Sequence, residues 1–153
     1  MRHLLRRALV LTGLVDRLQP LGLLALRLYV SSVFFRSGLV KVSDWGATLA
    51  LFHDEYKVPL LPPDLAANMA VSIEVAAPIL LVAGLFTRLT ALVLLGMTTV
   101  IEVFVYPQAW PTHIQWVAML LVLLCRGPGW LSLDHLMGLL AGRGAKVPAA
   151  PAA

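Results

Sequence analysis

Residues 21–42, LGLLALRLYVSSVFFRSGLVKV, decide the fold class of this chain. A helix needs about 20 mostly apolar residues to cross a bilayer, and this stretch meets that requirement. Three further apolar stretches follow, at residues 64–86, 89–106 and 112–126, and the last is short enough to be either a full span or a tilted or buried half-length element. Backbone polar groups in lipid must be paired within the protein, which a helix achieves by itself. We therefore predict an all-α protein, a transmembrane four-helix bundle.

The composition of the chain excludes an ordinary soluble domain. Hydrophobic residues make up 59% of it and charged residues 13%, whereas soluble domains carry roughly 25% charged residues. The mean hydropathy is +0.85. The net charge of +4 does not indicate nucleic acid, because most basic residues flank the apolar stretches and they form no stripe with interleaved aromatic residues. We expect membrane lipids as partners and no nucleic acid.

The first 20 residues have a different pattern from the spans. Apolar side chains recur there at helical spacing, and arginines occupy the other faces. This pattern predicts a cytoplasmic amphipathic helix over residues 1–20 that lies in the membrane interface, with Pro20 separating it from the first span. We expect the membrane domain to occupy residues 21–140 and the Gly-, Ala- and Pro-rich residues 141–153 to be disordered. The segment between the first two spans is also predicted to be interfacial, anchored by Trp45, Phe52 and Tyr56.

Basic residues are distributed unequally between the two ends of the predicted spans. Cytoplasmic loops carry the excess of Lys and Arg, and an even number of spans returns the chain to its starting side. We therefore predict a multi-pass protein of the bacterial inner (plasma) membrane with both termini in the cytoplasm. The cytoplasmic set is Arg2, Arg6, Arg7, Arg17, Arg88, Arg126, Arg143 and Lys146, against Lys41 and Lys57 on the other side.

Ionisable residues inside the spans are the candidate functional groups, because each costs about 2.5–3.5 kcal/mol at the bilayer centre. Four of them fall in the middle or outer half of their spans, and His113 enters from the same side. Helical periodicity places Arg27 on the face of Lys41 and Arg36 on a nearly opposite face. A cofactor site or polar intramembrane cluster is predicted from Arg27, Arg36, Lys41, Glu74, Glu102, His113 and Trp116. The alternatives are that the charges only fix helix packing or that they move protons or ions.

Motifs of soluble enzymes are missing from the sequence. It contains no phosphate loop, no G-x-S-x-G and no HExxH. The clusters His53-Asp54-Glu55 and Asp134-His135 lack the spacing of metal ligands, so we expect no metal site. Cys125 is the single cysteine, which excludes a dithiol centre within the chain.

Two segments that overlap the first two apolar stretches resemble the DoxX family of small bacterial membrane proteins. They are ALRLYVSSVFFRSGLVKVSDW at residues 25–45 and SIEVAAPILLVAGLFTRLTAL at residues 72–92. The likeness extends through HIQWVAMLLVLLCRGPGWLSLDHL at residues 113–136. Its hallmark positions are Arg27, Phe34, Gly38 and Lys41 in the first span, then Glu74, Gly84, Thr87 and Arg88.

The resemblance implies a four-helix inner-membrane protein associated with redox or oxidative-stress assemblies; the family is named for a subunit of an archaeal thiosulfate:quinone oxidoreductase. Electron transfer by this chain would need a bound quinone or a redox partner protein, because it has no cysteine pair, haem-attachment motif or iron–sulfur spacing. We interpret it as a membrane subunit that binds quinone, with its own catalytic role open. Two other functions remain open, a non-catalytic scaffolding protein and a small-molecule transporter. The chain could also form a homo-oligomer.

Overall fold

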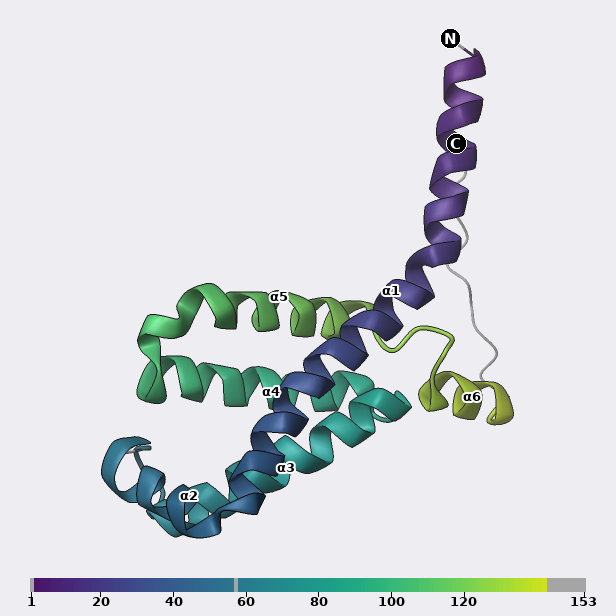
Figure 1. Cartoon of the computed structure of the whole chain (residues 1–153). Helices are drawn as coiled ribbons and strands as arrows, with labels where there is room; N and C mark the ends of the chain where they lie inside the picture. The colour runs from purple at the N-terminus through teal and green to yellow at the C-terminus, as the bar shows by residue number, and fades with distance from the viewer. Residues whose placement is uncertain (1, 57, 143–153) are drawn as a thin grey trace.

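The computed structural model describes the backbone of residues 2–56 and 58–142 and the side chains of residues 17–56 and 58–142. All regular structure in these ranges is helical, as predicted (Figure 1). In chain order the α-helices are α1 (Arg2–Ser43), α2 (Trp45–Leu51), α3 (Pro63–Ala83), α4 (Thr87–Val100), α5 (Trp110–Arg126) and α6 (Leu133–Leu140). Three short helices join them: the π-helices η1 (Phe52–Tyr56) and η2 (Ile101–Val105), and the 3₁₀-helix η3 (Pro107–Ala109).

Four helical segments are long and apolar enough to cross a membrane, which confirms the predicted fold class. They cover Arg17–Ser43, Pro63–Ala83, Thr87–Val105 and Pro107–Arg126. The fourth begins before the predicted residue 112 and reaches 20 residues, the length that a bilayer requires. The outward faces of these segments carry exposed apolar side chains, which suit lipid rather than water; they include Leu28, Val40, Ile79, Leu89, Leu92 and Leu121.

The described backbone has no separate N-terminal interfacial helix, so that prediction is corrected. Helix α1 runs without a break from Arg2 to Ser43, with Pro20 inside it. Proline removes one backbone hydrogen bond, and a long helix tolerates this loss by bending. The amphipathic face of residues 2–16 and the tail at 143–153 lie outside the described side chains.

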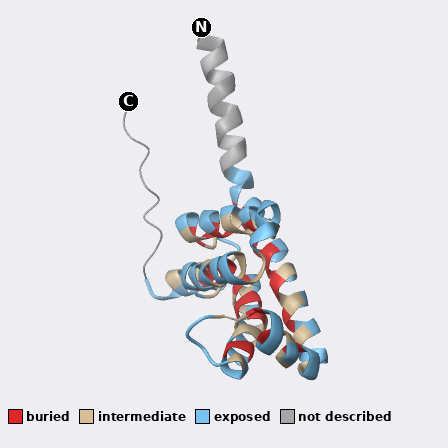
Figure 2. Ribbon diagram, turned by 90° about the vertical axis from the view of Figure 1, so that its left-hand side faces the viewer, coloured by how far each residue is buried: buried red, intermediate tan, exposed pale blue. Residues whose placement is uncertain are grey.

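The core lies where the four spans face one another. Helix α1 packs mainly against α3, and α4 packs mainly against α5. Figure 2 shows buried residues on the facing sides of the helices and exposed residues on their outward sides. The central cluster consists of Leu23, Val30, Phe34, Ala77, Leu81, Ala91, Leu94, Leu120 and Leu123.

A tight turn joins α3 to α4, and the chain near α6 closes over it. Gly84 ends α3 with a φ of +68°, a conformation that favours glycine. A Cβ at this position would overlap the side chains of Arg27 and Ser132. The Asp134 carboxylate accepts hydrogen bonds from the amides of Phe86 (2.8 Å) and Thr87 (2.9 Å). Asp134 therefore caps the start of α4, and Thr87, which lies between the predicted stretches 64–86 and 89–106, belongs to the helix.

The segment between the first two spans folds back against the bundle. Helices α2 and η1 contact the start of α3, and η1 also contacts η2. Phe52 and Tyr56 are buried there against Ala66 and Ala67. Their predicted role as lipid anchors is therefore wrong, because their rings pack inside the protein.

Candidate functional site

A buried ion pair joins α1 to α3. Lys41 Nζ lies 2.8 Å from both carboxylate oxygens of Glu74, and the Glu74 side chain is only 3% exposed. Ser37 completes the group: its hydroxyl accepts from Lys41 Nζ at 2.7 Å and donates to Glu74 Oε1 at 3.2 Å. Each charge thus has a partner of opposite sign and a further hydrogen bond, the condition for burying charges.

Gly38 allows the two helices to approach closely enough for this pair. A Cβ at residue 38 would lie 2.9 Å from Val75 Cγ2 and 3.0 Å from Glu74 Cβ. Small residues permit such close contact between membrane helices. Ser37 and Lys41 are four residues apart, so they lie on the same face of α1 and reach the same carboxylate.

A second polar pair joins α5 to η2. His113 Nδ1 lies 2.5 Å from Glu102 Oε2. An ionised carboxylate only accepts, so the imidazole donates in the tautomer that carries its proton on Nδ1. His113 is buried, and its ring lies 4.9 Å from the ring of Trp116, centroid to centroid. Glu102 sits in the π-helix Ile101–Val105.

Two tyrosines meet between η1 and the end of the third span. The hydroxyls of Tyr56 and Tyr106 are 3.1 Å apart, and their rings pack edge to face. Burial, and then the hydrogen bond with Tyr106, raise the pKa of the Tyr56 hydroxyl above its ordinary value. Tyr56 therefore stays neutral at physiological pH and can offer its proton to an oxygen atom.

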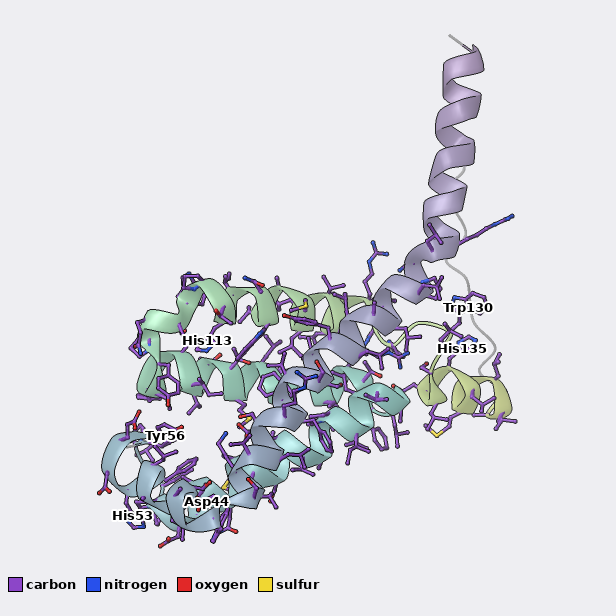
Figure 3. All side chains as sticks on the ribbon, in the orientation of Figure 1. Asp44, His53, Tyr56, His113, Trp130 and His135 are labelled. Carbon is purple, nitrogen blue, oxygen red and sulfur yellow. The ribbon has the colours of Figure 1, made fainter. Side chains whose placement is uncertain are left out.

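These groups surround one cavity of about 380 Å³. Its polar lining comes from Ser37, Lys41, Glu74, Tyr56, Tyr106 and His113, and its remaining walls are apolar. Figure 3 shows Tyr56 and His113 at the same end of the molecule, with Trp130 and His135 at the opposite end. A mostly apolar cavity with a few convergent polar groups is the usual form of a small-molecule site, and such sites measure about 300–1,000 Å³.

Comparisons with known proteins agree with this architecture. Residues 22–107, more than half of the chain, match the model of the DoxX family. The chain belongs to the DoxX family. It is a multi-pass membrane protein with four candidate spans. It is also similar to an uncharacterized protein of Haemophilus influenzae, 32% identical over 131 residues that cover 76% of this chain and 83% of the relative. No solved structure matches it.

The DoxX match covers one of the two polar pairs completely. Lys41 and Glu74 both lie within residues 22–107. Glu102 lies inside the matched range, whereas His113 and Trp116 lie beyond it. The cavity is therefore built from the matched region together with α5.

The structure brings together four of the seven residues predicted for this DoxX-family protein. Lys41, Glu74, His113 and Trp116 line the cavity. Glu102 does not line it but stands behind His113. The other two, Arg27 and Arg36, lie elsewhere.

Arg36 and Arg27 are separated from the cavity for different reasons. Arg36 is exposed on the outer surface of α1. Arg27 is fully buried near α6, where its Nη2 donates to the Leu131 carbonyl and the Asp134 carboxylate attracts it. Its Nε and Nη1 atoms have no hydrogen-bond partner among the described residues. Arg27 thus joins α1 to the segment that leads into α6.

Sequence reasoning missed Ser37, Tyr56 and Tyr106 as site residues. Ser37 carried a usable signal, because it lies one helical turn before Lys41. The tyrosines carried none, since their pairing depends on how η1 folds back. No group of three or more His, Cys, Asp or Glu residues suited to a metal occurs within residues 17–56 and 58–142, and Cys125 is exposed.

Proposed function

We propose that this DoxX-family protein binds a quinone in the cavity and serves as a membrane subunit of a redox or oxidative-stress assembly. The observation that carries the proposal is that Lys41, Tyr56 and His113 reach the same apolar cavity from three different helices. A quinone has an apolar ring and two carbonyl oxygens on opposite sides. The apolar walls suit the ring, the free hydroxyl proton of Tyr56 can be donated to one oxygen, and the His113 imidazole can bind the hydroxyl of the reduced form.

The cavity also lies close to the lipid. Met69 on α3 and Val100 on α4 line it and are at the same time exposed on the outside of the bundle. Both side chains are thus shared between the cavity and the accessible surface of these two helices. An isoprenoid tail can extend into lipid there while the ring occupies the cavity.

Quinone binding is tested on the full-length protein purified in mild detergent. We expect extracted lipids to contain quinone in near-stoichiometric amount, and an added short-chain quinone to bind saturably and quench tryptophan fluorescence, because Trp116 lines the cavity. A protein that contains no quinone and binds none would refute the proposal and leave the buried charges with a packing role.

Two alanines on α3 provide a matched pair of variants for this test. Ala70 lines the cavity, whereas Ala76 is exposed on the outward face. Ala70→Phe should fill the cavity and lower quinone affinity at least tenfold. Ala76→Phe adds the same side chain toward lipid and should leave affinity unchanged. Equal effects of the two variants would show that the quinone binds elsewhere.

A further inference from the structure

His113 stands between the cavity and the outside of the protein. Its side chain lines the cavity and is 5% exposed, whereas Glu102, its partner at 2.5 Å, lies outside the lining and is 19% exposed. Glu102 is three residues before the end of the third span at Val105, or about 5 Å at 1.5 Å per residue. The imidazole and the carboxylate thus form a polar path from the cavity toward the end of the bundle opposite α6.

The other ionisable groups that line the cavity are already engaged. Lys41 on α1 and Glu74 on α3 bind each other and Ser37. Tyr56 on η1 is paired with Tyr106. His113 differs from them, because its Nδ1 binds Glu102 while no described residue forms a hydrogen bond with its Nε2. The imidazole therefore has one nitrogen for the cavity and one for the carboxylate.

We infer that His113 and Glu102 form a proton-transfer route that takes a proton from a hydroquinone hydroxyl in the cavity to the bundle end opposite α6; this rests on the quinone binding proposed above. His113 Nε2 accepts the hydroxyl proton, and the Nδ1 proton passes to Glu102. Glu102 then releases it to solution. A histidine held by a carboxylate is a common general base, and such groups contribute about 10²–10⁴-fold to rates.

The overall reaction is balanced by a one-electron acceptor. One hydroquinone and two ferricyanide ions give one quinone, two ferrocyanide ions and two protons. In the assembly, an electron-carrying partner takes the place of ferricyanide. The route from His113 to Glu102 carries one of these two protons, that of the hydroxyl that faces Nε2, and the other hydroxyl gives its proton to the buffer. The route sets the rate when the deprotonation at Nε2 is slow.

The test measures binding and oxidation separately on the purified full-length protein. A short-chain hydroquinone is bound to excess protein and oxidised with ferricyanide in a stopped-flow instrument. We expect Glu102→Gln to slow oxidation at least tenfold while the dissociation constant stays within about twofold. Added formate should restore much of the lost rate, because Glu102 is accessible from outside and a small carboxylate can replace it. A purely structural role of Glu102 would not give this rescue.

Control variants keep the outcomes distinct. Glu102→Asp retains a carboxylate and should give an intermediate rate, and it serves if Glu102→Gln does not fold. Asp54→Asn removes an exposed acid in η1 that does not line the cavity, so its rate should equal that of the wild type. If hydroquinone binds and Glu102→Gln oxidises at the wild-type rate, the proton route is overturned and the quinone site stands. If neither the wild type nor any variant binds the hydroquinone, the proposed function itself fails.

Discussion

Lys41 and Glu74 lie in contact inside the bundle, and removal of one charge differs physically from removal of both. Lys41→Met leaves the buried Glu74 carboxylate without its cation, which we expect to destabilise the protein by about 3–5 kcal/mol. The double variant Lys41→Met/Glu74→Leu removes both charges and should recover most of that stability. The measurement is thermal unfolding of the purified protein in detergent.

Arg36→Gln is the control for this pair, since Arg36 is exposed on the same helix. Its unfolding temperature should match that of the wild type. A double variant that is as unstable as Lys41→Met would contradict the electrostatic explanation and assign the loss to side-chain packing.

Single residues show what the sequence could predict about the site. The depth of Lys41 and Glu74 follows from their distance along each span, and the two do meet at a common depth. Arg36 has a similar depth but lies five residues from Lys41, which rotates it by about 140° around α1. The position of each charged residue along its span therefore predicted that the charges lie at a similar depth in the membrane. Only the packing of α1 against α3 decides which of them face inward.

At the scale of elements, residues 131–140 tie the turn between α3 and α4 to α1. Asp134→Ala removes the acceptor for the amides of Phe86 and Thr87. Loss of a helix cap costs about 0.5–2 kcal/mol. We expect hydrogen exchange at these two amides to become about tenfold faster.

Asp44→Ala is the matched control, because Asp44 caps α2 by accepting from the Ala47 amide at 2.9 Å. It should speed exchange in α2 and leave the start of α4 unchanged. Unaltered exchange at Phe86 and Thr87 in Asp134→Ala would show that the turn holds without its cap.

Elements that depend on local sequence could be predicted, whereas elements that depend on contacts between distant residues could not. Hydrophobic length located the first three spans, because each must match the bilayer by itself, whereas the fourth begins five residues before its predicted start at 112. The π-helix at Ile101–Val105 and the continuous helix through Pro20 were not predicted. In the first, the widened turn accompanies the contact of Glu102 with His113 on another helix; in the second, Pro20 is buried against the loop at Gly129. Both depend on distant residues that local patterns do not reveal.

At the scale of the whole molecule, the bundle has two chemically different ends. One end carries the cavity with Tyr56 and His113, and the other carries α6 with Trp130 and His135 (Figure 3). The charge distribution predicts that the α6 end is cytoplasmic. The proton route inferred above would then exchange protons with the outer side of the membrane.

Membrane topology is tested by single cysteines placed at the two ends after Cys125→Ala removes the native thiol. Asp54 and Ala141 are both exposed, so Asp54→Cys and Ala141→Cys report on opposite ends of the bundle. A membrane-impermeant maleimide should label Asp54→Cys in intact spheroplasts and should label Ala141→Cys only after permeabilisation, because a charged reagent does not cross lipid. Labelling of Ala141→Cys in intact spheroplasts, with Asp54→Cys protected, would invert the topology. The cavity and its proton exit would then face the cytoplasm, and an electron-carrying partner would have to be sought on that side.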